Sequence, residues 1–519
     1  MNKRSKIVCA LIAVMLTASV AFAGCSKKNV QSTTNPGARI VSGVDVTKEV
    51  QLTMYLVGDA LTDAGKVYDE VNKKLKQDIN TTVNVKYLSW ADWDKKYPLV
   101  LASGEDLDTI YTADWAYYAS QATKGAFKEI DPVMLKKYMP EYYSKVPTNF
   151  WNEIKINGKI YMVPYLNQQV EGMNMVLYRG DLRTKYNLPE IKSTDDFANY
   201  LTTIVKNEKG MVGFDGSAGN IADMMNSLFY RQPNELFMYH TVPFFTTKLN
   251  DMNGAVNFAL DDPAYLDMLK TAKKLADAGV WSKGILASKN DNAKAFDSGK
   301  TPFIINNPEG MILGTDSNNT KHPDWKVEIG DVAPDKLHES SSGTRSGMAI
   351  SSNSKNVERV MLMLNLFGTH KDYYDLTTYG IEGTHYKAIG DNKIKSTDEG
   401  LKNYAPKGNC PWGWERKDFM RYPENLPEPI INLESNWIKN GLSSKNPIVS
   451  FNFVDTDVMN EMAACNNLYQ TRGYILLTGM AANPEAELTK LKDDLKKAGI
   501  DTIKVELQKQ VTAYLQSLK

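Results

Sequence analysis

Residues 159–182 read KIYMVPYLNQQVEGMNMVLYRGDL, and this stretch decides how the chain is divided. The apolar run 160–163 predicts a strand, which Pro164 ends because proline has no N–H and a fixed φ. A polar segment follows, and the apolar run 173–178 predicts a second strand. Taken alone, the stretch favours a hairpin inside one domain. The rest of the chain favours a crossing between two lobes, with Tyr165 at the mouth of a cleft.

The start of the chain predicts export from the cytoplasm. A basic beginning, the apolar run 7–22 and small residues before Cys25 are typical of a secretory signal at 1–24. The apolar run is too short to span a membrane comfortably. The sequence FAGC at 22–25 resembles a bacterial lipobox, although phenylalanine stands where leucine is more usual. We expect cleavage before Cys25 and acylation of its thiol, for example by palmitate; an ordinary signal peptide with an incidental cysteine is the alternative.

Length and charge narrow the possible classes of protein. The 519-residue chain would keep 495 residues after loss of the signal, which is too many for one core, so we expect at least two lobes. Its 61 basic and 61 acidic residues leave no positive surplus for binding nucleic acid. No later apolar stretch is long enough to cross a membrane.

The cysteines and histidines of the sequence do not predict a catalytic or metal site. Cys410 and Cys465 could form a disulfide in an exported protein or remain two buried thiols. The five histidines are scattered and show no metal-ligand spacing, so we expect no cofactor. A metal site built from backbone and carboxylate oxygens is left open.

Strands and helices alternate after a predicted flexible tether at 25–48. The expected elements are strands at 51–57, 82–88 and 108–111, and helices around 67–75, at 90–102 and at 114–123. This order predicts a parallel sheet with helices on both faces. Ligands bind beyond the carboxyl ends of such strands, where the loops 58–60, 89–90 and 112–115 would lie.

The elements expected in the second half of the chain complete the predicted division into two lobes. Strands are expected at 301–306 and 347–351, helices at 263–278 and from 357 to 367, and a loop-rich region at 379–437. Asn483 and Pro484 are typical of a helix start, and two final helices are expected. We therefore predict an α/β protein. Its parts are lobe 1 at 49–165 and 301–345, lobe 2 at 166–300 and 346–480, and C-terminal helices at 481–519.

Aromatic side chains beside polar ones suggest a sugar site. An aromatic ring can cover the apolar C–H face of a sugar while polar side chains bind its hydroxyls. The candidate ligand-binding residues are Asp59, Trp90, Asp114, Trp115, Tyr165, Asn167, Arg345, Glu382, Trp412 and Trp414. We expect Trp115 to stack on the sugar, and Trp412 and Trp414 to close from the second lobe. Any one of these aromatic residues could instead be ordinary packing.

Several short motifs, in order along nearly the whole mature chain, carry a family resemblance. They are LSWAD at 88–92, LASG at 101–104, NGKIY at 157–161 with VP at 163–164, YGIEGTHY at 379–386 and AGID at 498–501. In this order the chain resembles family 1 extracellular solute-binding proteins, in particular the LplA/LipO-type subgroup.

The resemblance implies a periplasmic-binding-protein-like fold, in which two α/β lobes are joined by hinge strands. It also implies a monomeric receptor, lipid-anchored at the outer face of the cell membrane, that serves the permease subunits of an ABC importer. The implied ligand is an oligosaccharide, and the subgroup is often labelled for uronate-bearing ones.

Two other functions remain open from the residues themselves. An exported glycan-active enzyme would use paired carboxylates, but no motif in the sequence selects such a pair. A surface adhesin would lack a deep cleft between lobes. A receptor needs no catalytic residues, and it would bind its sugar stoichiometrically and leave it unchanged.

Overall fold

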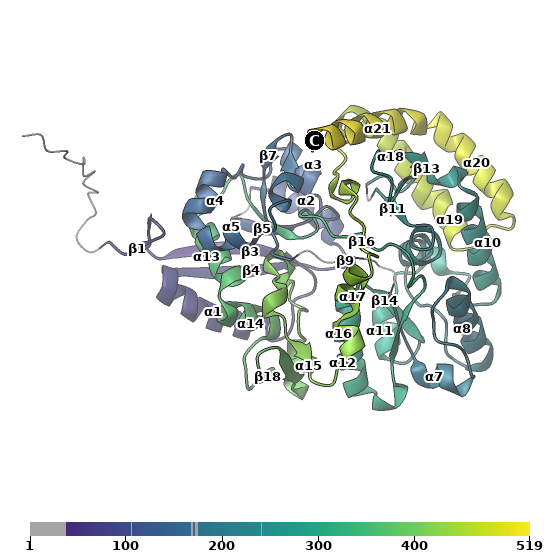
Figure 1. Cartoon of the computed structure of the whole chain (residues 1–519), viewed down its shortest axis with the longest axis horizontal. Coiled ribbons are helices and arrows are strands. Elements are labelled where there is room, and N and C mark those ends of the chain that lie inside the picture. Colours follow the sequence, from purple (N-terminus) through teal and green to yellow (C-terminus); the bar gives the residue numbers. More distant parts are fainter. Residues whose placement is uncertain (1–37, 105, 168–169, 172–174, 240, 519) are drawn as a thin grey trace, which may run out of the picture. The chain divides into compact units, whose positions relative to one another are not determined.

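The fold has two lobes, as predicted for an α/β protein (Figure 1). Each lobe has a large apolar core of its own. The computed structural model describes residues 38–104, 106–167, 170–171, 175–239 and 241–518. The predicted signal and Cys25 lie outside these residues. One compact unit begins at Ile40. Part of the predicted tether therefore belongs to it: β1 (Ile40–Val41) pairs with β2 (Val44–Asp45), and Val46 is fully buried.

The first lobe is built on a five-stranded sheet. Its order is β4 (Thr81–Leu88), β3 (Val50–Val57), β5 (Thr109–Thr112), β17 (Gly347–Ile350) and β8 (Met162–Pro164). The pairs β3–β4 and β3–β5 are parallel, which confirms the predicted parallel strands. β17 runs antiparallel to both of its neighbours. Consequently the carboxyl ends of β3, β4, β5 and β8 and the beginning of β17 share one edge.

Apolar spacing explains the helices of this lobe. In α1 (Ala64–Ile79), Val67, Val71 and Leu75 recur at helical spacing and are fully buried. α2 (Trp93–Ala102) begins three residues later than expected, which leaves Trp90 in a loop. α3 (Tyr118–Thr123) likewise begins after the expected start, so that residues 114–117 form a turn. α13 (Val357–Thr369) and α14 (Lys371–Tyr379) complete the covering.

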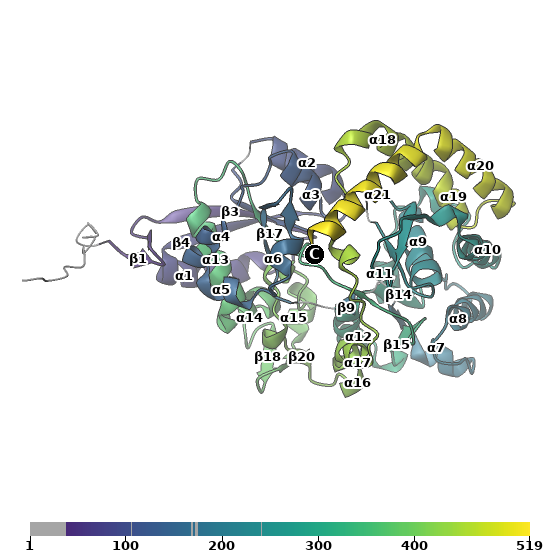
Figure 2. The same ribbon diagram turned by 45° about the horizontal axis from the view of Figure 1, so that its top comes forward.

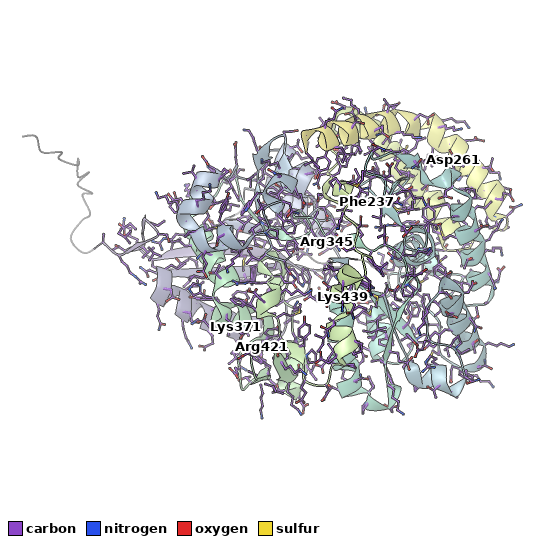
Figure 3. All side chains as sticks on the ribbon, in the orientation of Figure 1. Phe237, Asp261, Arg345, Lys371, Arg421 and Lys439 are labelled. Carbon is purple, nitrogen blue, oxygen red and sulfur yellow. The ribbon has the colours of Figure 1, made fainter. Side chains whose placement is uncertain are left out.

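Buried charged side chains tie distant segments of the first lobe together. Arg359 of α13 donates to the carbonyl oxygens of Asp45, Lys48, Ile79 and Asn80. These bonds fasten the beginning of the folded chain to the corner between α1 and β4. A second cluster holds the loop after α14, because Lys371 and Arg421 both bind the carboxylate of Asp375 (Figure 3).

The second lobe is centred on a three-stranded antiparallel sheet. Its central strand β10 (Met175–Tyr178) lies between β14 (Phe303–Asn306) and β15 (Glu328–Asp331). A separate sheet contains β11 (Leu236–Met238), β12 (Phe245–Lys248) and β13 (Asn257–Phe258). The helices α8 (Thr194–Asn207) and α10 (Pro263–Asp277) pack into the same core.

The C-terminal helices extend this second core. Asn483 caps α20 (Pro484–Lys497) by accepting from the Ala486 N–H, and Pro484 takes its first position, as predicted. α21 (Ile500–Ser517) follows Gly499. α20 contacts α10, and both α20 and α21 contact α18 (Met459–Leu468), beside which they lie in Figure 2.

The stretch 159–182 is a crossing and not a hairpin, because β8 and β10 belong to different sheets. Residues 168–169 and 172–174 within it lie outside the described residues. Two further crossings run beside it. β16 (Glu339–Ser340) pairs with β9 (Val170–Glu171), and His338 exchanges backbone hydrogen bonds with the segment 442–444.

The predicted lobe boundaries after residue 300 are wrong. The segment 301–345 does not return to lobe 1, since β14 and β15 both pair with β10 and Phe303 packs against Phe197 of the second core. Residues from Gly347 to about Trp414 belong to lobe 1 and not to lobe 2, because β17 pairs with β5 and β8. A four-residue apolar strand carries no local signal of which sheet it will join.

Candidate functional site

The pocket lies at the shared strand edge of the first lobe and faces the beginning of α12 (Pro308–Lys321). The register explains this convergence. Gly347 of β17 lies opposite Thr112 and Pro164, so Arg345 and Ser346, which precede it, meet Trp115 and Tyr165, which follow the other two strands. The resulting cavity measures about 560 Å³. The pocket therefore lies at the edge where ligands of parallel sheets are expected to bind.

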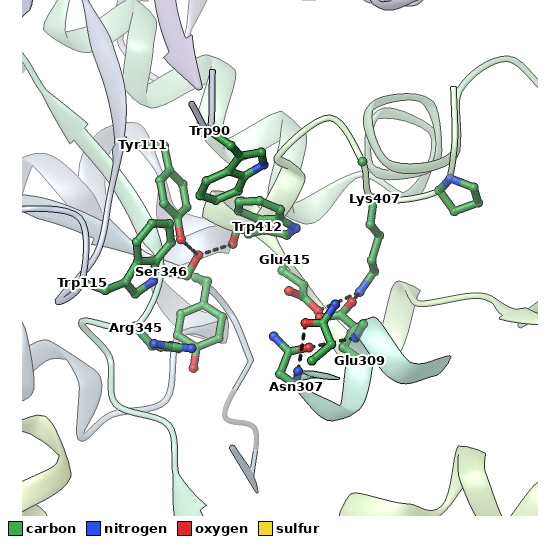
Figure 4. Close-up of a pocket in the computed structure, with 15 residues that line it drawn as sticks. Trp90, Tyr111, Trp115, Asn307, Glu309, Arg345, Ser346, Lys407, Trp412 and Glu415 are labelled. Carbon is green, nitrogen blue, oxygen red and sulfur yellow. Dashed lines mark hydrogen bonds and ion pairs between the residues drawn. The ribbon is translucent and has the colours of Figure 1, made fainter. Parts of the chain in front are cut away.

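One wall of the pocket is aromatic. The Trp90 ring stacks near Trp115 with centroids 6.2 Å apart, and its centroid is 6.1 Å from that of Trp412. Tyr111 packs between Trp115 and Trp412, at 5.6 and 5.7 Å. Figure 4 shows these rings grouped on one side of the cavity. The side chain of Trp90 is 49% exposed, whereas Trp115 and Trp412 are half-buried.

The Ser346 hydroxyl and the close packing of Gly413 hold this wall in place. The Ser346 hydroxyl lies 3.1 Å from the Tyr111 hydroxyl and 2.9 Å from the carbonyl oxygen of Trp412. Gly413 packs so closely on β17 that a Cβ there would come within 2.5 Å of the Met348 sulfur. Any side chain at 413 would therefore push Trp412 away from the pocket. Burial raises the pKa of Tyr111 well above its ordinary value, so its hydroxyl stays protonated.

The opposite wall comes from the second lobe. Asn306 ends β14, and Asn307 caps α12 by accepting from the Gly310 N–H at 2.8 Å. Glu309 follows in the first turn of the helix and lines the pocket with them. The first-lobe residues that meet this wall are Pro406, Lys407, Gly408 and Glu415.

A buried ion cluster joins the two walls. The ammonium group of Lys407 lies 2.9 Å from a carboxylate oxygen of Glu415 and is ion-paired with Glu309 (Figure 4). The side chain of Lys407 is 4% exposed. Burial lowers the pKa of Lys407, and the Glu415 carboxylate opposes this shift. Because Glu309 belongs to the second lobe and the other two residues to the first, the cluster connects the lobes across the pocket.

Five of the ten predicted site residues line the pocket together: Trp90, Trp115, Tyr165, Arg345 and Trp412. Tyr165 is almost fully buried, and its hydroxyl donates to Ser341 at 2.6 Å. Trp412 belongs to the first-lobe wall and not, as expected, to the second lobe.

The other predicted site residues lie outside the lining. Asp114 is behind it, where a carboxylate oxygen is 3.8 Å from the guanidinium of Arg345. Asp59 accepts a hydrogen bond from Ser89, and Asn167 is buried. Glu382 is exposed and accepts from the Ala388 N–H at 3.4 Å.

Trp414 is a core residue and not a pocket residue. It is fully buried, and its indole nitrogen donates to the Thr377 hydroxyl at 3.0 Å. Trp412 and Trp414 lie on one 3₁₀ turn, Pro411–Trp414. With three residues per turn, positions i and i+2 point in different directions, so only one of the two rings can face the cavity.

The sequence reasoning missed the second-lobe wall and the ion cluster. The missed lining residues are Tyr111, Asn306, Asn307, Glu309, Gly310, Ser346, Pro406, Lys407, Gly408 and Glu415. Asn306 and Asn307 follow a strand and precede a proline at a helix start, so the strand-end rule applied to the second sheet would have found them.

The described part of the chain contains neither a disulfide nor a cluster of metal ligands. Cys410 lies in the first core and Cys465 in the second, and both are free, buried thiols. Within residues 38–518, apart from the gaps given above, there is no group of three acidic, histidine or cysteine side chains placed to hold a metal ion. The helices of this described part include none both long and apolar enough to cross a bilayer.

Solved structures share this fold. An N-glycan transport solute-binding protein from Streptococcus pneumoniae, in complex with Man1GlcNAc, is 22% identical with a TM-score of 0.73, covering 90% of this chain and 100% of that one. An alginate-binding protein without calcium ion is 16% identical with a TM-score of 0.62, covering 90% and 99%.

Two sequence relatives match over two thirds or more of their own length. A carbohydrate ABC transporter substrate-binding protein from Streptococcus pneumoniae serotype 4 is 24% identical over 90% of this chain and 91% of its own. The polygalacturonan/rhamnogalacturonan-binding protein YtcQ of Bacillus subtilis is 23% identical over 65% of this chain and 67% of its own.

Two families match the chain directly. A domain of unknown function, DUF3502, matches residues 447–516, which include the C-terminal helices. The family described as bacterial extracellular solute-binding protein matches residues 67–375, more than half of the chain. Its members bind solutes outside the cytoplasm and are not enzymes. The predicted resemblance is confirmed: the chain belongs to the bacterial extracellular solute-binding protein family.

Proposed function

We propose that the protein is a lipid-anchored receptor that captures an oligosaccharide in the pocket between its lobes and delivers it to an ABC importer. Cys25 carries the anchor in this proposal, and the permease subunits recognise the closed, loaded form. The lobes open and close about the three crossings, since the cluster around Lys407 is the kind of contact made only when the lobes meet.

The observation that carries the proposal is the aromatic wall facing a polar wall. Trp90, Trp115 and Trp412 offer flat apolar surface suited to the C–H faces of sugar rings. Asn306 and Asn307 on the other side offer amide groups suited to sugar hydroxyls. A cavity of about 560 Å³ is large enough for a short oligosaccharide.

The relatives support the same ligand class. The pneumococcal relative is named for carbohydrate, the Bacillus relative for polygalacturonan and rhamnogalacturonan, and the solved neighbour for N-glycan transport. Asp114, Asp59 and Asn167 act in this proposal as supports of the site: Asp114 pairs with Arg345, Asp59 binds Ser89, which precedes Trp90, and Asn167 comes two residues after Tyr165. Glu382 and Trp414 have no part in it.

A thermal-shift screen of the purified full chain against neutral and acidic oligosaccharides tests the proposal. We expect at least one oligosaccharide to raise the melting temperature, and calorimetry to give a stoichiometry of one. Chromatography of the sugar afterwards should return it unchanged. Cleavage of the sugar would favour the exported-enzyme alternative, and stabilisation by none of the sugars would overturn the proposal.

A further inference from the structure

The cationic groups of the pocket are each already matched by a carboxylate of the protein. The charged side chains among its described lining residues are Glu309, Arg345, Lys407 and Glu415, two of each sign. The arrangement of these four, together with Asp114 behind them, bears on the class of sugar that fits. A sugar acid needs a cation that is available to it, whereas a neutral sugar needs only hydrogen-bonding groups.

Lys407 is held between two carboxylates. Its ammonium group lies 2.9 Å from Glu415 and is ion-paired with Glu309, and the three side chains are 4%, 6% and 12% exposed. A uronate that approached Lys407 would therefore meet two negative groups at the same time. It would also lose its own hydration on entering, with no uncompensated positive charge in return.

Arg345 has a carboxylate directly behind it. Its guanidinium is 3.8 Å from Asp114, whose carboxylate also accepts the Trp115 N–H at 2.7 Å. Burial raises the pKa of Asp114, and the guanidinium opposes the rise. With Asp114 ionised, the five groups carry one net negative charge, and with Asp114 protonated they carry none. In neither state does the pocket have a surplus of positive charge.

Building on the proposed function, we infer that the site selects neutral oligosaccharides over uronate-bearing ones, and that Glu309 and Asp114 determine this specificity. The uronate-bearing ligand that the family resemblance left open is therefore not expected here. The two carboxylates act from different ends of the cavity. Glu309, with Glu415, leaves the Lys407 end with one net negative charge that repels a sugar acid, and ionised Asp114 offsets the positive charge of Arg345 at the other end. The aromatic wall contributes equally to the binding of neutral and acidic sugars, because the C–H faces of their rings are the same.

Matched sugar pairs that differ only in oxidation at C6 provide the test. We would titrate the purified full chain by calorimetry with mannotriose and trimannuronate, galactotriose and trigalacturonate, and cellotriose and its triuronate. For each pair that binds, we expect the neutral member to bind at least about tenfold more tightly, or about 1.4 kcal/mol. A uronate that binds as tightly as its neutral counterpart overturns the inference and leaves the proposed function intact. Binding of none of the six sugars, with no hit in the oligosaccharide screen, overturns both.

Two variants assign the selectivity to residues. Glu309→Gln and Asp114→Asn keep side-chain size and remove one negative charge, and each should move the neutral-to-uronate affinity ratio about tenfold toward the uronate. The ratio is informative even where a variant changes lobe closure, because closure affects both sugars of a pair. Glu208→Gln is the matched control, since Glu208 directly follows α8, binds Lys185 and Tyr186, and does not line the pocket. Folded variants with an unchanged ratio would overturn the assignment, and circular dichroism checks the folding.

Discussion

Trp90 offers the most direct test of the aromatic wall, because replacing it disturbs the fold least. Its side chain is 49% exposed, so a bound sugar can cover at most about half of the indole. Complete burial of a large apolar side chain is worth about 1.5–3 kcal/mol, so half of it is worth about 0.75–1.5 kcal/mol. Trp90→Ala should therefore weaken oligosaccharide binding about four- to twelvefold.

The same reasoning sets the effect of Trp90→Ala on stability. The half of Trp90 that is already buried packs against Trp93, Trp115 and Trp412, and losing it should cost about 1 kcal/mol of unfolding free energy. Gly58 lies under the ring: a Cβ there would come within 3.3 Å of the indole nitrogen. Gly58→Ala should consequently tilt the ring and reduce affinity, without removing any side chain from the wall.

Isothermal titration calorimetry with an oligosaccharide found in the screen measures these effects. Trp90→Phe keeps an aromatic face and should retain affinity within about threefold of the parent. Leu99→Ala is the control for loss of an exposed apolar side chain, because Leu99 is 65% exposed on α2 and does not line the pocket. The reasoning fails if folded Trp90→Ala binds within twofold of the parent.

Three further outcomes test the anchor, the N-terminal clamp and a buried histidine. Cys25→Ser should move the protein from the membrane fraction to the medium or block its processing; unchanged membrane retention would refute the lipobox interpretation. Arg359→Met should lower the free energy of unfolding by about 3–5 kcal/mol in urea titrations, because four carbonyl oxygens lose a charged donor, and a loss below 1 kcal/mol would contradict this. Burial lowers the pKa of His338 to about 4, so that as the pH falls below 6.5 the histidine takes up a proton in the unfolded chain before it does so in the folded one. The free energy of unfolding of the parent should therefore fall by roughly 3 kcal/mol relative to that of His338→Gln between pH 7 and pH 4. A constant difference between the two proteins across that range would show that His338 titrates normally.

Much of the first lobe could be predicted because its signals are local. Pro164 ends β8, and the spacing of Val67, Val71 and Leu75 forms α1, so each element follows from a few neighbouring residues. The alternation of strands and helices then predicts that β3, β4 and β5 run parallel, and with this it predicts the edge where Trp90 and Trp115 lie.

The division of the chain after residue 300 could not be predicted in the same way. β14 and β17 are both four-residue apolar strands, yet one completes the second sheet and the other the first. The two strands differ in the partner with which they pair, β10 for β14 and β5 for β17. Each partner lies more than a hundred residues earlier in the chain. Trp412 and Trp414 differ for a related reason, since only the orientation of one tight turn decides which ring reaches the cavity.

The position of the pocket and its charge therefore depend on different kinds of information. Strand ends position Trp115, Tyr165 and Asn307 whatever their side chains are, so topology alone predicts where the cavity forms. The charge balance depends on Glu309 meeting Lys407, a contact between two lobes across 98 residues of sequence. Composition cannot predict such a pair, because a chain with 61 basic and 61 acidic residues can have a pocket of either charge. A family resemblance that gives the fold for this reason leaves the ligand open, and the sign of the charge in the pocket has to be determined from the structure.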